Sequence, residues 1–222
     1  MGVSLRESRM YPIIFMVILT IVLTAILALF YEVSKERVVA YRELSFKQDL
    51  IGLFQTQIKA AGNKDIKKFD LNEISTIYTK HFAEMKSDDE SMTYYQVKNN
   101  EKIIGYVYPY KVSGLWGTIS MLAAVDARFQ KIIGLRITDQ NETPGLGGRI
   151  AENWFQHQFT GKNFRDNDVF KSWSLVAEDN SGAEDTIRQI TGATISSRSV
   201  VDGLLLRLQE TWKTAQIKGE SK

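Results

Sequence analysis

The chain has 222 residues, with 28 Lys plus Arg against 26 Asp plus Glu, two histidines and no cysteine. Without a thiol it can hold no iron-sulfur cluster, Cys-ligated zinc, disulfide or thiolate nucleophile of its own. The histidines, His81 and His157, lie far apart in the sequence, which argues against a His-based metal centre or a Ser-His-Asp triad. A net charge of +2 lacks the basic excess of a nucleic-acid binder, and the length suits one domain with an appendage.

The appendage is at the N-terminus, where residues 11–31 carry no charge. At about 1.5 Å per residue this segment reaches roughly 31 Å, enough for a hydrocarbon core of about 30 Å. A cleaved signal peptide is the alternative, but its apolar region is usually about 7 to 15 residues long and ends at an A-x-A-like site, which is missing here. We therefore expect a retained transmembrane helix over 11–31, after a tail over 1–10. The Lys and Arg count on its two sides slightly favours a cytoplasmic domain but does not decide the orientation.

The next part of the chain has a helical pattern. Apolar residues over 32–61 form a stripe that predicts a stalk helix, which Ala61-Gly62-Asn63 ends. A second, short helix is expected from Asp70 towards Met85.

Beyond Met85 the pattern changes to that of strands, rich in Tyr, Val and Ile. Four strands are predicted, over 92–97, 102–112, 118–125 and 129–138. Helices are expected over 150–159 and 196–217, the latter with apolar residues spaced by four. The sequence thus predicts an α+β domain over 62–217, with a mainly antiparallel sheet, flanking helices and a polar tail over 218–222.

The segment over 140–148 has a loop-like composition. Pro144-Gly145 fits a type II turn, because Pro fixes φ at the first central position and Gly accepts a positive φ at the second. Gly147 and Gly148 add exposed backbone N–H groups that could face an anion or let a flat ring approach closely. The segment matches neither the Walker A nor the dinucleotide fingerprint, so a plain surface loop is the alternative.

The segment over 191–197, TGATISS, stands immediately before the C-terminal helix. Small hydroxyl residues there are most often caps, and Ser199 with Asp202 has the spacing of a capping box. The functional alternative is a phosphate at Thr194, which the unpaired N–H groups and positive dipole of a helix N-terminus would favour.

The segment over 114–117 places Trp116 between two glycines, where the indole could lie against an aromatic cofactor. A core tryptophan is the alternative. None of these segments offers a nucleophile or general base in a catalytic constellation, so we assign no catalytic residue and no metal ligand.

Together the three segments resemble the FMN-binding domain family shared by the G subunit of Rnf complexes and the C subunit of the sodium-translocating NADH:quinone oxidoreductase. Residues 114–117 correspond to the family's GLWG, 142–147 to its ETPGLG and 191–194 to its [S/T]GAT. The motifs occur in the family's order, the resemblance covers roughly residues 90–210, and the single N-terminal span agrees with the family layout.

The resemblance implies FMN as the cofactor, joined covalently through its phosphate to the hydroxyl of Thr194 by a separate flavin transferase. It also implies that Glu142, Thr143, Leu146 and Gly147 lie along the flavin, with Trp116 near its ring. From its position after the second loop, Lys162 is expected at the cofactor as well, and Gly192 and Ala193 would leave room for the phosphate at Thr194. Two positions depart from the family pattern. Arg188 stands where an Asp usually lies three residues before [S/T]GAT, and Gln140 replaces a His that often precedes ETPGLG.

The implied function is that of a flavoprotein subunit that relays electrons within an Rnf-type ion-translocating ferredoxin:NAD oxidoreductase. Its partners would be other membrane, iron-sulfur and flavin subunits, the flavin transferase and lipid, with no nucleic acid. The domain would lie on the periplasmic side of the cell inner membrane. The short chain favours the Rnf G type over the Nqr C type; a stand-alone anchored flavin sensor and a scaffold that never carries flavin remain alternatives.

Overall fold

The computed structural model describes residues 10–58, 66, 69–87, 92–180 and 182–219, and the chain divides into two compact units, 1–45 and 46–222. Helix α1, Tyr11–Ile58, passes from the first unit into the second. The side chains of residues 11–33 are all exposed, and this helix is long and apolar enough to cross a membrane. The predicted end of the stalk helix at 61–63 lies outside the described residues.

The second unit begins within α1, at Phe46, and so before the boundary expected at residue 62. The last turns of α1 bury apolar side chains against one face of the sheet. Glycines in the sheet permit this close approach: a Cβ atom on Gly105 would lie 2.8 Å from Phe54 Cζ, and one on Gly134 would lie 2.8 Å from Leu53 Cδ2. The end of the helix predicted as a stalk is therefore part of the domain core.

Helix α2, Leu71–His81, begins at the predicted place, where a capping box satisfies its first N–H groups. The Asp70 carboxylate accepts from the Glu73 N–H at 2.7 Å, and the Glu73 carboxylate accepts from the Asp70 N–H at 3.0 Å. The helix is shorter than expected, because the residues towards Met85 form strand β1, Phe82–Lys86, instead. Pairing with the next strand satisfies this backbone, and the Phe82 ring packs against Phe54.

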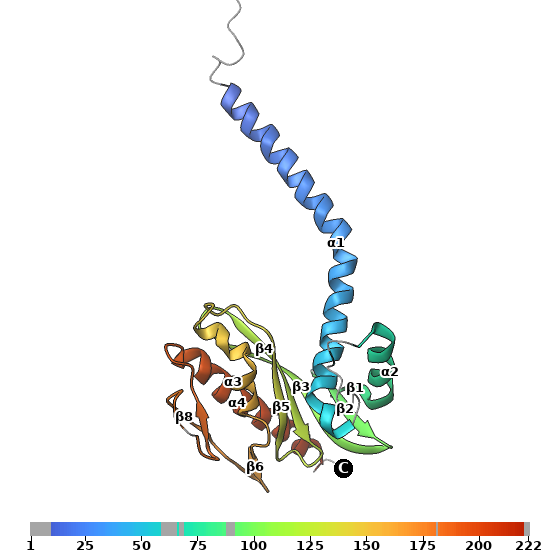
Figure 1. Cartoon of the computed structure of the whole chain (residues 1–222), viewed down its shortest axis with the longest axis vertical. Coiled ribbons are helices and arrows are strands. Elements are labelled where there is room, and N and C mark those ends of the chain that lie inside the picture. Colours follow the sequence, from blue (N-terminus) through green and yellow to red (C-terminus); the bar gives the residue numbers. More distant parts are fainter. Residues whose placement is uncertain (1–9, 59–65, 67–68, 88–91, 181, 220–222) are drawn as a thin grey trace, which may run out of the picture. The chain divides into compact units, whose positions relative to one another are not determined.

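Five strands form one antiparallel sheet in the order β1-β2-β3-β4-β5 (Figure 1). The four predicted strands are present as β2, Thr93–Asn99; β3, Lys102–Ser113; β4, Thr118–Asp126; and β5, Ile132–Asp139. Ser113 of β3 faces Thr118, and Ser120 of β4 faces Asp139. The β3–β4 turn and the end of β5 therefore emerge at the same end of the sheet.

The sheet face opposite α1 carries the remaining helices: the 3-10 helix η3, Gly147–Ala151; α3, Asn153–His157; and α4, Thr194–Gly219. The helix expected over 150–159 is thus divided between η3 and α3. α4 begins at Thr194, so Ser199 lies inside the helix and does not cap it. This face holds the main core, formed by the inward side chains of the sheet with Phe155, Phe159 and Val200, Val201, Leu204, Leu205 and Leu208.

Two small sheets complete the domain. β6, Arg165–Asp166, pairs with β7, Val169–Phe170, in antiparallel fashion. β8, Ser174–Val176, pairs with β9, Thr186–Arg188, in parallel. β9 leads directly into the turn before α4, so this sheet fixes one end of the TGAT segment.

Candidate functional site

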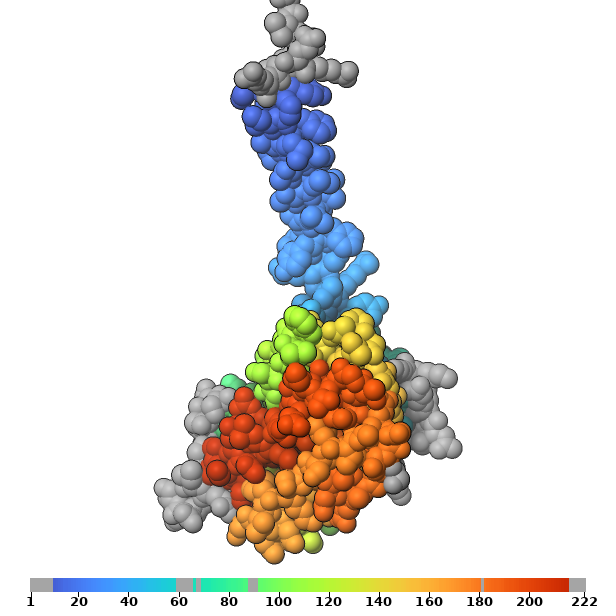
Figure 2. Space-filling view, turned by 90° about the vertical axis from the view of Figure 1, so that its left-hand side faces the viewer, coloured from blue at the N-terminus to red at the C-terminus, as the bar shows by residue number. Residues whose placement is uncertain are grey.

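The three motif segments meet at one end of the domain. In Figure 2 the light green, yellow and orange-red parts of the chain lie side by side on the face shown. They enclose a cavity of about 330 Å³. Its lining residues are Leu115, Trp116, Glu142, Thr143, Leu146, Gly147, Gly192, Ala193, Thr194, Ile195 and Ser196. Every residue predicted to lie along the cofactor, except Lys162, is therefore at one site.

The segment over 114–117 is the turn between β3 and β4, closed by a hydrogen bond of 2.7 Å from the Gly114 N–H to the Gly117 carbonyl. Trp116 is 69% exposed and Leu115 52% exposed, although both are large and apolar. A core role for Trp116 is thereby excluded. The turn holds two large apolar side chains at the rim of the cavity.

The loop after β5 contains the predicted turn. Gly145 has φ +74°, and the Leu146 N–H donates to the Thr143 carbonyl at 3.1 Å. The two glycines that follow do not form the expected row of free N–H groups. The Gly148 N–H donates to the Thr143 carbonyl at 3.0 Å, and Gly147 is buried. Gly147 is instead a place where other side chains come close to the backbone.

The TGAT segment turns sharply into α4. Gly192 has φ +76°, which favours glycine, and the Ala193 N–H donates to the Ile190 carbonyl at 2.9 Å. Ser197 fixes this turn, because its hydroxyl accepts from the Ile190 N–H and donates to the Ala193 carbonyl, each at 3.0 Å. Thr194 is the first residue of the helix and is exposed. Its hydroxyl is thus available at the cavity rim.

Arg198, which was not among the predicted site residues, lies beside the cavity. It lines a second hollow together with Thr194, Ile195, Ser199 and Asp202. The sequence could have indicated this position, because Arg198 follows Thr194 by four residues and residues four apart on a helix share a face. A guanidinium one turn from the Thr194 hydroxyl would suit a phosphate group.

The buried side chain that joins the three segments is Glu142, which is only 4% exposed. One carboxylate oxygen accepts from the Trp116 backbone N–H at 3.0 Å, and the other accepts from the Ser196 hydroxyl at 2.5 Å. Its own backbone N–H donates to the side-chain oxygen of Gln140 at 2.6 Å, which gives the residue at the family's His position a structural role.

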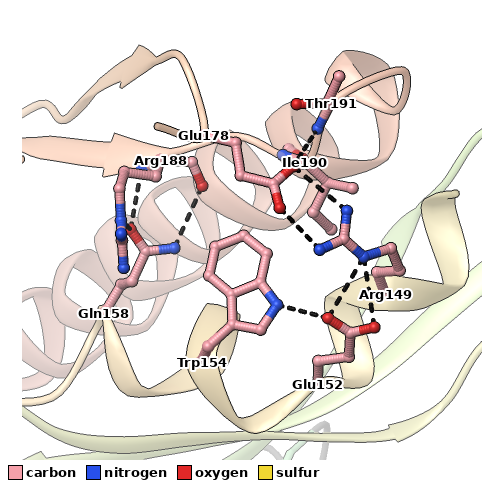
Figure 3. Close-up of polar contacts among 9 residues, drawn as sticks. Arg149, Glu152, Trp154, Gln158, Glu178, Arg188, Ile190 and Thr191 are labelled. Atoms are coloured by element: carbon pink, nitrogen blue, oxygen red, sulfur yellow. Dashed lines mark hydrogen bonds and ion pairs between the residues drawn. The ribbon is translucent and has the colours of Figure 1, made fainter. Parts of the chain in front are cut away.

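A second carboxylate, Glu178, holds the TGAT segment from the outside (Figure 3). It accepts two hydrogen bonds from the Arg149 guanidinium, at 2.7 and 3.2 Å, and one from the Thr191 N–H at 2.8 Å. The hydrogen bonds from Arg149 and then from Thr191 lower the pKa of Glu178 to about 2. This pair ties η3 to the turn before α4.

The same outer cluster contains Arg188, the residue that replaces the family's Asp. Its guanidinium lies 5.6 Å from the Trp154 ring, and that of Arg149 lies 5.5 Å from it. The Arg188 N–H donates to the Gln158 side-chain oxygen at 2.8 Å, and the Trp154 indole donates to Glu152. Arg188 is thus integrated into the wall outside the cavity.

Lys162 is placed elsewhere by the fold. Its ammonium donates to the carbonyls of Ala183 and Glu184, at 3.3 and 2.6 Å, in the chain that leads to β9. Burial lowers the pKa of its ammonium group. Lys162 thus joins two segments of the domain and is not among the residues that line the cavity.

Residues 114–207 match the model of the FMN-binding domain family. The chain is 37% identical to the G subunit of the ion-translocating oxidoreductase complex of Methanosarcina acetivorans, over 50% of this chain and 54% of the relative. It is 32% identical to the G subunit of the Na(+)-translocating ferredoxin:NAD(+) oxidoreductase complex of Acetobacterium woodii, over 56% and 58%. It is 31% identical to the C subunit of the Na(+)-translocating NADH-quinone reductase of Vibrio vulnificus, over 48% and 42%. The chain thus spans about half the length of the curated relatives it matches.

The fold is also similar to that of solved structures. The C subunit of the Na(+)-translocating NADH-quinone reductase of Parabacteroides distasonis superposes with a TM-score of 0.58 and 23% identity, over 78% of this chain and 94% of that one. Shewanella oneidensis NqrC gives a TM-score of 0.53 and 18% identity, over 70% and 89%. These structures confirm the expected fold class, and the family model and the relatives above confirm the resemblance to the FMN-binding domain family.

Proposed function

We propose that this chain, which contains an FMN-binding domain over residues 114–207, is a membrane-anchored subunit that carries FMN and relays electrons within an Rnf-type ion-translocating ferredoxin:NAD oxidoreductase. The observation that carries the proposal is the meeting of three separate segments around one cavity, with the exposed Thr194 hydroxyl at its rim.

The FMN would be attached through its phosphate to Thr194, by a separate flavin transferase. The site fits such a group, because the hydroxyl is exposed and stands at the start of α4, where the helix dipole favours negative charge. Arg198 adds a positive charge to the adjoining hollow. Gly192, whose φ is +76°, and the small Ala193 leave room beside the attachment point.

The ring of the flavin would lie against the apolar side chains of the cavity. Trp116 and Leu146 are 69% and 44% exposed, and covering them would remove apolar surface from water. The Thr143 hydroxyl could bond a ribityl or ring oxygen. When bound, FMN supplies the electron-transfer chemistry, while these side chains set its orientation and surroundings.

The complex type is inferred from the relatives. The aligned part makes up 54% and 58% of two G subunits but 42% of a C subunit, which favours the Rnf G type. The alternative is the C subunit of a sodium-translocating NADH:quinone oxidoreductase. Co-purification with several multispan subunits would support either complex, whereas isolation of the tagged chain alone would support a stand-alone anchored sensor. A chain that never acquires flavin would be a scaffold.

Attachment is tested by intact-mass measurement of the chain coexpressed with a flavin transferase. We expect one FMN increment in the wild type, none in Thr194→Val, and an unchanged increment in the control Thr214→Ala, which removes a hydroxyl of α4 that lines neither the cavity nor the adjoining hollow. Retention of the increment in Thr194→Val, or its mapping to Thr191, Ser196 or Ser197, would refute the assignment.

The location of the domain is tested separately. We propose that the part after Tyr31 lies on the periplasmic side of the cell inner membrane, although the Lys and Arg count slightly favours the cytoplasm. A reporter fused after Lys222 that is active only in the periplasm is the expected result. Activity only in the cytoplasm would overturn the proposed orientation.

A further inference from the structure

Glu142 has an unusual position for a charged side chain. It is 4% exposed, and its carboxylate binds two parts of the chain that lie 26 and 54 residues away in sequence. Burying a carboxylate is costly unless hydrogen bonds compensate for the lost water. Here the compensation comes from the Trp116 N–H and the Ser196 hydroxyl, one on each oxygen.

Two glycines make room for this carboxylate. A Cβ atom on Gly147 would lie 2.8 Å from one Glu142 oxygen and 2.5 Å from Ser196 Oγ. A Cβ atom on Gly114 would collide with the other Glu142 oxygen and would lie 2.9 Å from the Gly117 carbonyl. Neither glycine has the positive φ that would otherwise explain it. The space that the Glu142 side chain occupies therefore explains why glycine stands at position 114 of the GLWG segment and at position 147 of the loop.

The location of Ser196 further stabilises the negative charge of the carboxylate. Ser196 is in the first turn of α4, next to Thr194 and Ile195, so the negative charge of Glu142 lies near the positive end of the helix dipole. The same contact fixes the rotation of the turn from which Thr194 projects. A substitution at Glu142 would thus alter the positions of the cavity wall, of the turn that holds Trp116 and of the proposed attachment residue.

We infer that Glu142 is a positioning residue: its buried carboxylate assembles the three segments into the flavin cavity before any flavin is present. This inference rests on the proposed function for its biological meaning, but the hydrogen bonds that carry it are made within the chain itself. Both carboxylate oxygens are engaged with the protein, which distinguishes Glu142 from Thr143 and Leu146, the exposed members of the same loop.

The experiment is amide hydrogen exchange on the flavin-free full chain in detergent. In Glu142→Gln, which keeps the shape but removes the charge, we expect the Trp116 amide to exchange about tenfold faster, because a charged acceptor becomes a neutral one. Ser196→Ala removes the hydroxyl that binds the other oxygen of the Glu142 carboxylate. In this variant we expect the Trp116 amide and the amides of the first turn of α4 both to exchange faster. The amides of β4 should be unaffected in both.

Two matched controls accompany these variants. Ser199→Ala lies on the same helix, and Glu152→Gln neutralises a glutamate of the outer cluster; both should leave the Trp116 amide unchanged. The inference is overturned if Ser196→Ala changes only α4, or if Glu142→Gln changes only residues 140–148, since Glu142 would then not couple the segments.

A second measurement separates positioning from simple stabilisation. In wild type and Glu142→Gln loaded with FMN, the midpoint potential of the flavin should be more positive in the variant, because a negative charge beside the cavity disfavours the added electrons. An unchanged potential would contradict the placement of this charge beside the flavin. If the wild type takes up no FMN, the proposed function fails while the exchange result still decides the role of Glu142.

Discussion

Two carboxylates hold the segment that begins α4, and they use opposite physical means. Glu142 is buried and accepts from two neutral donors, the Trp116 N–H and the Ser196 hydroxyl. Glu178 has a side chain 27% exposed and is paired with the Arg149 guanidinium at 2.7 Å. The first contact is shielded from water and salt, whereas the second is open to both.

The two contacts hold the segment with different rigidity. Removing one member of a buried hydrogen-bonded group leaves its partners unsatisfied, which costs much more than the bond contributes on balance. A partly exposed ion pair loses most of its Coulomb energy to solvent, even when its geometry is good. We therefore expect the inner side of the segment to be fixed by Glu142 and the outer side to be adjustable.

The largest effect is expected for Glu142→Ala in the flavin-free chain. The Trp116 N–H and the Ser196 hydroxyl would each lose their acceptor, at about 1–3 kcal/mol apiece, so we predict a loss of about 2–6 kcal/mol in the free energy of unfolding. Urea denaturation of the wild type and the variant measures it. A loss no greater than that of Glu178→Ala would contradict the comparison.

The next effect is steric. Gly147→Ala places a Cβ atom 2.5 Å from Ser196 Oγ, and such overpacking typically costs about 1–3 kcal/mol of stability. The neighbouring Gly148→Ala, whose nearest contact would be the Thr143 carbonyl at 3.3 Å, is the control and should cost less. In the double variant Gly147→Ala/Ser196→Ala the two losses should be less than additive, because one substitution removes the atom with which the other collides. Full additivity would show that the collision is relieved elsewhere.

Much of this site could be predicted from the sequence. The richness in Tyr, Val and Ile predicted the four strands β2 to β5, and the Pro144-Gly145 pair predicted a turn in which Gly145 does adopt a positive φ. The three motif segments could be placed at one site through the family resemblance. Strand β1 was missed, because residues 82–86 become a strand through pairing with β2, which no local pattern shows.

The role of Glu142 could not be predicted in the same way. Its partners lie 26 and 54 residues away, and only the register of the sheet and the start of α4 bring them together. The same limit explains Lys162, which was placed by its position after the second loop. The fold carries its ammonium to the Ala183 and Glu184 carbonyls instead. The sequence motifs identified the segments, and tertiary contacts decide what each side chain does within them.

A smaller effect, dependent on pH, is expected at Glu178. Its pKa is lowered from 4.5 to about 2, so its contribution to stability is complete above pH about 4.5 and is lost as the pH falls towards 2. The difference in stability between wild type and Glu178→Gln should therefore be constant from pH 5 to 7 and vanish near pH 2. Unfolding curves across this range measure it, and added salt should reduce it. A difference that grows towards low pH would contradict the assignment.

The smallest effect on stability is expected for the double variant Thr143→Ala/Leu146→Ala, because both residues are exposed members of the loop that Glu142 anchors. The anchor lies behind them, so the cavity should keep its shape and Thr194 should still acquire FMN. The ring, however, would lose an apolar contact and a hydrogen-bond partner. We predict an unchanged FMN mass increment, lower flavin fluorescence anisotropy and a shifted midpoint potential. If anisotropy and potential both equal those of the wild type, the loop does not contact the flavin, and its role is confined to carrying Glu142 into the core.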